Sequence, residues 1–346
     1  MKNKTIIYLL IAANILVYVT VGLLLGVNID SFGKVFFPKE SRLNDIRDIL
    51  RLDPGKHRIV PDVRVLISEK ISEKVVRKKI IFRLEKDLRA RDAISKQPEI
   101  AETRGFIFHP PDIFRKYPAV LVFHGHGEGV ENTSITKDAY DLCKELAENG
   151  FVSFTFSLKD IEKSMGYDDH RKASRTQIVK GCPILSVYIY AGIRALDYLT
   201  YADFADRDRL GVAGESMGGH AAVYLAALDN RVKSVVNAAY FRSYSELPAD
   251  PEICTCNYLP GMAEKYDFPV IASLISPRPA AYCIGENDMN TSLETAERLL
   301  ETIVLPEYQK RSKKDNLVMF KHTGGHNMPV GYAVQRFKKT LYRDVR

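Results

Sequence analysis

The stretch RLGVAGESMGG, residues 209–219, limits the possible fold classes more than any other part of this chain. Its first half is apolar and predicts a strand at 209–213, and the residues after it predict a helix at 217–228. The turn between them reads Gly-x-Ser-x-Gly, in which flanking glycines permit the tight turn that lifts a serine hydroxyl above a sheet. The segment therefore predicts Ser216 as a nucleophile. The competing interpretation is a chance pattern in a glycine-rich turn.

Strands and helices are predicted to alternate on both sides of this segment. Strands are expected at 59–67, 75–84, 105–109, 119–123, 151–158, 209–213, 232–238, 280–284 and 317–321. Helices are expected at 40–52, 136–149, 184–200, 217–228, 292–304 and 329–342. Such alternation is typical of an α/β fold with a mostly parallel central sheet and helices on both faces. Ligands bind at the carboxyl ends of such strands, so we expect the chemistry there.

A serine hydroxyl needs a general base to become a nucleophile. His326 lies in HTGGHNMP, residues 322–329, on a loop with two glycines after the last predicted strand. His322 is closer to that strand and is interpreted as structural. His326 is therefore the predicted base.

The base must in turn be oriented by an acid. Asp288 lies in GEND, just after the strand at 280–284, and Glu286 is the rival two residues earlier. Asp288 is favoured because the Gly-x-x-Asp spacing carries it past the strand end into the loop. The chain order Ser216, Asp288, His326 is the one that this fold requires. An ordinary helix N-cap role is the alternative for either acid.

An oxyanion hole needs two backbone donors. The amide of Met217, next to the nucleophile, is the first prediction. The second is the amide of His126, in the loop HGHGEG at 124–129. Two other interpretations of this loop are weaker: a His-x-His metal pair lacks a third ligand at suitable spacing, and a phosphate loop lacks its Lys-Ser/Thr.

Five cysteines at irregular spacing form no disulfide framework. They are Cys143, Cys182, Cys254, Cys256 and Cys283. The spacing of Cys254-Thr-Cys256 is compatible with a metal or redox pair. No second Cys/His pair at zinc spacing accompanies it, so both cysteines are interpreted as packing within a loop. No metal and no cofactor are therefore predicted.

The chain opens with an apolar segment. Residues 5–29 carry no charge and are long enough to span a bilayer as a helix. A signal peptide is the rival, but no small-residue cleavage site is evident. We therefore predict a single-pass membrane protein that contacts lipid through residues 5–29. Lys2 and Lys4 precede the segment and basic residues also follow it at 34–42. The extracytoplasmic side is favoured for the rest of the chain.

Three regions follow from these patterns. They are an anchor at 1–30, a juxtamembrane stem with N-terminal strands at 31–100, and a catalytic domain at 101–346 with a cap segment near 240–268.

The net charge is +7, yet acidic residues are interleaved with the basic ones. No aromatic-interleaved basic motif is present, which argues against nucleic-acid binding. The oligomeric state is left open.

Several blocks resemble the α/β-hydrolase superfamily and, within it, the dienelactone-hydrolase and acetyl-xylan-esterase-like branch. The matching blocks are HGHGEG (124–129), GCPILSVYIYAGIRALDYL (181–199), RLGVAGESMGG (209–219), YLPGMAEKYDFPVIASLISPRP (258–279), GENDM (285–289) and GGHNMP (324–329). The resemblance implies Ser216 as nucleophile, His326 as base and Asp288 as its partner. It also implies an oxyanion hole formed by the amides of His126 and Met217.

The resulting hypothesis is a carboxylic ester hydrolase that works through an acyl-enzyme. A carbohydrate acetyl ester is the first expectation for its substrate, and it rests on the resemblance alone. One alternative is a serine peptidase of the oligopeptidase type, although about 100 upstream residues are too few for a propeller. Another is a catalytically silent membrane-anchored binding or scaffold protein.

Overall fold

The computed structural model describes residues 39–52, 61–85, 100–126, 137–249 and 253–342. Its contacts divide the chain into a unit of residues 1–46 and a unit of residues 47–346. Helix α3 (Lys39–Ile49) crosses that boundary. Everything described below lies in the second unit.

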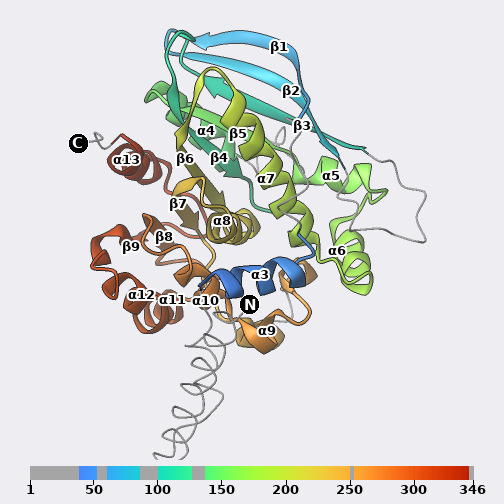
Figure 1. Cartoon of the computed structure of the whole chain (residues 1–346), viewed down its shortest axis with the longest axis vertical. Helices are drawn as coiled ribbons and strands as arrows, with labels where there is room; N and C mark the ends of the chain where they lie inside the picture. Colours follow the sequence, from blue (N-terminus) through green and yellow to red (C-terminus); the bar gives the residue numbers. More distant parts are fainter. Residues whose placement is uncertain (1–38, 53–60, 86–99, 127–136, 250–252, 343–346) are drawn as a thin grey trace, which may run out of the picture. The chain divides into compact units, whose positions relative to one another are not determined.

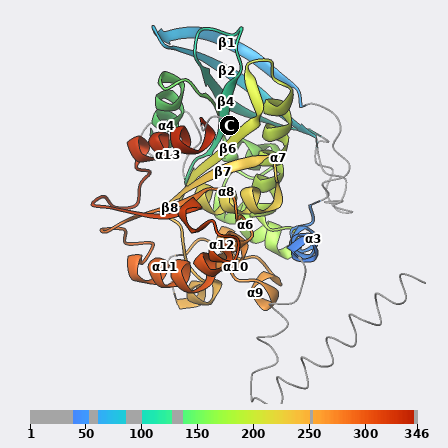
Figure 2. The ribbon, with the colours of Figure 1, turned by 60° about the vertical axis from the view of Figure 1, so that its left-hand side comes forward.

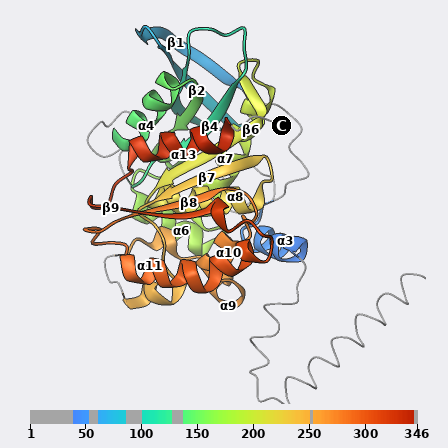
Figure 3. The same ribbon diagram turned by 90° about the vertical axis from the view of Figure 1, so that its left-hand side faces the viewer.

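The second unit is built on one nine-stranded sheet (Figure 1). Its strands are β1 (Val63–Ser72), β2 (Val75–Glu85), β3 (Ile100–His109), β4 (Tyr117–Phe123), β5 (Val152–Phe156), β6 (Ala205–Glu215), β7 (Val232–Ala238), β8 (Ala280–Gly285) and β9 (Leu317–His322). They lie in the order β1-β2-β3-β5-β4-β6-β7-β8-β9. The first four in this order pair antiparallel, and from β5 to β9 every pair is parallel. The predicted mostly parallel sheet is confirmed, and Figure 3 shows β1 and β9 at its two edges.

Helices cover both faces of this sheet, as predicted. The described helices of this unit are α4 (Lys137–Glu148), α5 (Leu158–Ser164), α6 (His170–Val179), α7 (Ile184–Tyr201), α8 (Met217–Leu228), α9 (Met262–Lys265), α10 (Phe268–Ser273), α11 (Leu293–Leu299), α12 (Leu305–Gln309) and α13 (Val330–Leu341). Helices α4 and α13 lie on one face and α7 and α8 on the other (Figure 2). Every residue of α8 is buried, because this helix is apolar all round. Helix α8 is therefore part of the hydrophobic core.

The charged stretch at 159–180, where the sequence predicts no helix, is largely helical. It forms α5 and α6, and each helix begins at a side-chain cap. Ser157 accepts a hydrogen bond from the Asp160 amide, and Asp169 accepts one from the Lys172 amide. Capping of this kind stabilises a short helix by about 1 kcal/mol, which a charge pattern does not reveal.

The helix predicted at 292–304 is also more broken than expected. It consists of α11, one π-helical turn at Leu300–Val304, and α12. In the region predicted to be irregular, 240–268, the described residues include 3₁₀ turns at Tyr244–Ala249 and Thr255–Asn257 and the short helix α9. These turns lie beyond the carboxyl end of β7.

The predicted membrane segment, residues 5–29, lies outside the described residues. Within the described part of the chain, no single helix combines the length and the apolar character needed to cross a bilayer. Membrane attachment stays a prediction from the sequence.

Candidate active site

Ser216 lies at the junction of β6 and α8 in a strained backbone conformation. Its φ is 53° and its ψ is −123°. A residue with a side chain rarely adopts positive φ, and such strain costs about 1–3 kcal/mol. The glycines around it are required by close approach: a Cβ on Gly214 would clash with the Gly218 carbonyl, and one on Gly218 with the carbonyls of residues 123 and 124. The sequence motif therefore forms the strand–turn–helix elbow that was predicted.

Asp288 and His326 form a hydrogen-bonded pair. The His326 Nδ1–H donates to both carboxylate oxygens of Asp288, at 2.9 and 3.0 Å. The Asp288 side chain has no exposed surface, whereas the His326 side chain is 27% exposed. The amides of Asn290 and Thr291 also donate to Asp288 Oδ1, at 2.8 and 3.1 Å. This arrangement fixes the imidazole tautomer and leaves Nε2 with its lone pair.

The loops that carry these two residues are tied to each other. The Glu286 amide donates to the His322 carbonyl at 2.8 Å, and the Asn287 amide donates to the Gly324 carbonyl at 3.1 Å. The Asn287 side chain donates to the Thr323 carbonyl at 2.8 Å. Glu286 itself is exposed. Of the two candidate acids, the structure thus places Asp288 against His326.

The two predicted oxyanion donors lie beside the same cavity. Met217 is the first residue of α8, so its amide has no acceptor inside the helix. His126 follows β4 and is positioned by His124, which is buried. The His124 Nδ1–H donates to the Gly125 carbonyl at 2.7 Å, and its Nε2 accepts from the Leu158 amide at 3.0 Å. Burial lowers the pKa of His124 to about 4, so the ring is neutral and ties this loop to α5.

One cavity of about 520 Å³ joins these groups. Ser216, Met217, His126 and His326 all line it. Its other polar lining residues include Lys159, Asp168, Asp169, Arg171, Arg242 and Asn290. The structure thus brings four of the five predicted site residues to one cavity, and Asp288 lies behind His326.

A second group of reactive side chains was not expected from the sequence. His126, His170, Cys254 and Cys256, here called the Cys/His cluster, offer ligand atoms that all lie within 4.8 Å of one another. Three of them line the cavity that contains Ser216, and Cys256 lies behind. Further ligands that sequence spacing does not reveal thus lie beside His126 and the Cys254-Thr-Cys256 pair in the folded chain. Helix α6, which brings His170 to the cysteines, is not among the helices that the sequence predicts.

The electrostatics of the Cys/His cluster are unusual. The pKa of the Cys254 thiol is lowered, chiefly by a hydrogen bond from Cys256, and both histidines act in the same direction. Burial lowers the pKa of His170, but the Cys254 thiol and the Glu162 carboxylate outweigh it and raise this pKa to about 10. Shifts of this size are typical of functional sites.

Solved structures of esterases share this fold. A glucuronoyl esterase from Solibacter usitatus superposes with a TM-score of 0.65 at 15% identity, covering 87% of this chain and 92% of that one. A Bacteroides fragilis NCTC 9343 protein, provisionally described as an acetyl xylan esterase, gives a TM-score of 0.62 at 16% identity, covering 89% and 82%. At this identity the likeness establishes the α/β-hydrolase fold.

Similarity in sequence gives the family. The Bacillus subtilis (strain 168) protein YtaP, whose name provisionally assigns it to the hydrolases, is 28% identical over 293 residues, which are 72% of this chain and 93% of that protein. The model of the dienelactone hydrolase family matches residues 103–304, more than half of the chain. This match spans β3 to the π-helical turn and includes the elbow and Asp288. The chain therefore belongs to the dienelactone hydrolase family.

Proposed function

We propose that this protein is a carboxylic ester hydrolase in which Ser216 forms an acyl-enzyme. One observation carries the proposal: a strained serine elbow and a hydrogen-bonded His326–Asp288 pair meet at a single cavity. Nucleophile, base and orienting acid are the three groups that acyl transfer to serine needs. Membership of a hydrolase family and the esterase fold neighbours support the same reaction class.

The chemistry follows from this arrangement. Ser216 Oγ attacks the ester carbonyl carbon while His326 Nε2 takes its proton, and Asp288 stabilises the imidazolium that forms. The amides of Met217 and His126 donate to the developing oxyanion. The carbon–oxygen bond to the alcohol then breaks, and His326 returns the proton to the leaving oxygen. Water repeats the sequence on the acyl-serine and releases the acid.

For the substrate, we propose a small acyl ester of a carbohydrate. The cavity lining combines apolar side chains with charged and amide side chains, and the polar ones suit the hydroxyl groups of a sugar. Two fold neighbours are described as acting on acetyl xylan and on glucuronoyl esters. Because one fold hosts many substrates, the polar lining is the stronger of these two arguments.

The test is active-site labelling of the full-length protein with a fluorophosphonate probe, beside hydrolysis of p-nitrophenyl acetate and of acetylated xylo-oligosaccharides. Wild type should label and release acetate from the oligosaccharide. Ser216→Ala should lose labelling and at least about 10⁴-fold in kcat/KM. Ser68→Ala, on the exposed side of β1, is the matched control and should behave as wild type. Labelling of Ser216→Ala, or an inert but folded wild type, contradicts the proposal.

A further inference from the structure

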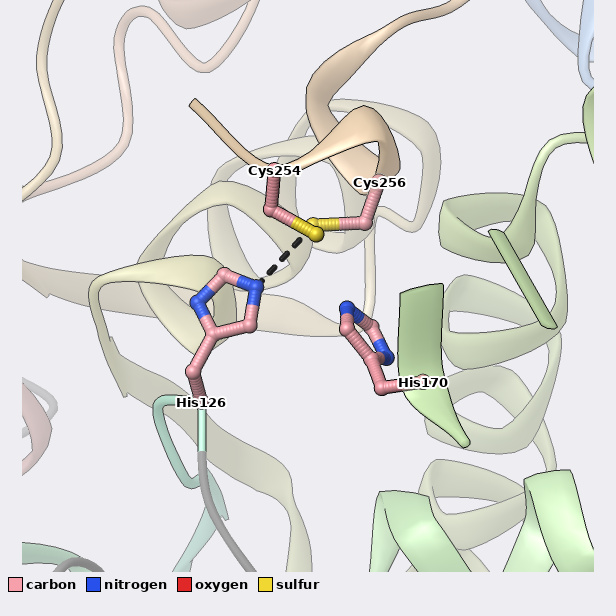
Figure 4. Close-up of side chains that lie close together, drawn as sticks. All are labelled: His126, His170, Cys254 and Cys256. Carbon is pink, nitrogen blue, oxygen red and sulfur yellow. Dashed lines mark hydrogen bonds between the residues drawn. The ribbon is translucent and has the colours of Figure 1, made fainter. Parts of the chain in front are cut away.

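We propose that His126, His170, Cys254 and Cys256 bind one Zn²⁺ ion. Figure 4 shows the two thiols and the two imidazoles converging, with one nitrogen of each ring turned toward the sulfur atoms. The four ligand atoms lie within 4.8 Å of one another, and His126 Nε2 is 3.1 Å from Cys256 Sγ. Nothing in the reaction proposed above uses this arrangement.

The spacing fits a tetrahedral site after a small contraction. Zinc binds thiolate sulfur at about 2.3 Å and imidazole nitrogen at about 2.0–2.1 Å, so ligand atoms around it lie about 3.3–3.8 Å apart. The separations here exceed that range by at most about 1 Å, which small side-chain rotations can close.

The donor set selects the metal. Two sulfur and two nitrogen ligands suit tetrahedral zinc, whereas magnesium and calcium require oxygen ligands. No carboxylate belongs to the cluster itself. A two-His, two-Cys set is also the composition of many structural zinc sites.

A buried carboxylate supports one of the proposed ligands from behind. The His170 Nδ1–H donates to Glu162 Oε1 at 2.6 Å, and the Tyr188 hydroxyl donates to the same oxygen. The Glu162 side chain is 3% exposed. A carboxylate that accepts from the far nitrogen of a histidine is the usual support of a zinc-bound imidazole. It orients His170 so that Nε2 is the ligand atom, and this nitrogen is buried without a hydrogen-bond partner in the described part of the chain.

The four ligands come from three separate segments. His126 follows β4, His170 is the first residue of α6, and both cysteines lie at the 3₁₀ turn Thr255–Asn257. Four protein ligands leave no open position, so the ion would be structural. It would fasten the turn region 253–257 and helix α6 to the loop that carries His126. This last consequence rests on the proposed function, because it matters for catalysis only if the His126 amide serves as an oxyanion donor.

The experiment measures metal content rather than activity. Full-length protein, expressed with zinc in the medium and purified without chelator, is analysed by elemental mass spectrometry, and zinc is then exchanged for Co²⁺. We expect about one zinc per chain, together with the intense visible bands and the thiolate charge-transfer band of tetrahedral cobalt.

Variants test the ligand set one residue at a time. Cys254→Ser, Cys256→Ser, His170→Gln and His126→Ala should each retain less than about a tenth of the wild-type zinc and lose the cobalt bands. Cys182→Ser, a cysteine outside the cluster, is the matched control and should keep both. Circular dichroism checks that each variant is folded.

Two outcomes overturn the proposal. One is folded wild type with no more zinc than Cys256→Ser; the other is a Cys254–Cys256 disulfide, found by peptide mapping of protein freshly purified from cells. The serine-hydrolase proposal fails separately: Ser216→Ala should keep its zinc, and a zinc-loaded wild type that is never labelled by fluorophosphonate would refute only the esterase.

Discussion

The proposed catalytic triad and the Cys/His cluster meet at one cavity, but they are held in different ways. Ser216, Asp288 and His326 each follow directly from a strand of the parallel sheet, and the loops of the last two are hydrogen-bonded to each other. His170 and the two cysteines lie on short helices and turns outside the sheet. The sheet therefore assembles one group, whereas side-chain contacts between short segments, such as the 2.7 Å hydrogen bond between the Ser174 and Thr255 hydroxyls, assemble the other.

The group fixed by the sheet is the proposed catalytic one, and the Cys/His cluster is proposed to have a structural role. A group fixed by the sheet keeps its geometry when a neighbouring loop moves. A group that spans three short segments depends on the bonds between those segments, and a metal ion would add four such bonds to the side-chain hydrogen bonds already present. Substitutions in one group should therefore leave the defining property of the other intact.

The largest effect is expected from Asp288→Asn. The amide cannot hold the imidazole in the correct tautomer or stabilise its charge, so kcat should fall by about 10⁴-fold. Zinc content should stay at the wild-type value. Steady-state hydrolysis of p-nitrophenyl acetate and elemental analysis of one preparation measure both, with Glu286→Gln as the control that changes neither. Equal losses in the two acid variants would refute the choice of Asp288.

Cys256→Ser should have a smaller effect on catalysis. Without zinc the His126 loop is less firmly held, so kcat should fall by about 10- to 100-fold, no more than the loss of one oxyanion donor. Ser216 should still react with fluorophosphonate, which separates this variant from a triad variant. A kcat equal to that of wild type in a zinc-free protein would show that the two groups are independent.

Glu162→Gln removes the carboxylate behind His170 without removing a ligand. Zinc affinity should weaken by about 10- to 100-fold, the usual effect of losing such support. Competition with a chromophoric chelator measures it, and labelling of Ser216 should change less than the affinity. Unchanged affinity would mean that the ion does not use His170.

The smallest expected effect is on the free energy of unfolding at acid pH, and it comes from His220 in helix α8. Burial, with a lesser contribution from Arg242, lowers the pKa of His220 to about 3, and Tyr240 stacks on its ring. The unfolded chain takes up this proton near pH 6.5 and the folded chain does not. His220 thus contributes stability above that pH and loses it as pH falls toward about 3.

Between pH 6.5 and 5 the loss attributable to His220 should be about 1–2 kcal/mol. Urea unfolding of wild type and His220→Gln across this range measures it. The variant should show a flatter dependence on pH, even though it is less stable at pH 7. An identical slope in both proteins would contradict the assignment.

The sequence predicted the sheet-borne part of the molecule well. The helix at Met217–Leu228 and the strand at Val232–Ala238 have the predicted bounds, because both are mainly apolar and a turn signal, Asp229-Asn230, separates them. Asp288 and His326 were predicted for a similar reason, since each follows a predicted strand. Their contact, and the shared cavity, needed the folded chain.

The Cys/His cluster could not be predicted in this way. Spacing rules for metals find ligands that are close in sequence, whereas His126, His170 and Cys254 are far apart in the chain. The one available signal was Cys254-Thr-Cys256. The cap at Asp169, which starts α6 and sets the direction of His170, was hidden in a charged stretch.

The environment of Asp288 has a kinetic consequence. Its carboxylate is fully shielded from solvent. It already accepts hydrogen bonds from two backbone amides and from the imidazole. When positive charge forms on His326, no water shell around this carboxylate has to reorient, because its dipolar partners are fixed in advance. The groups around the carboxylate are ordered once, during folding, so their ordering adds no reorganisation energy to this step at each turnover.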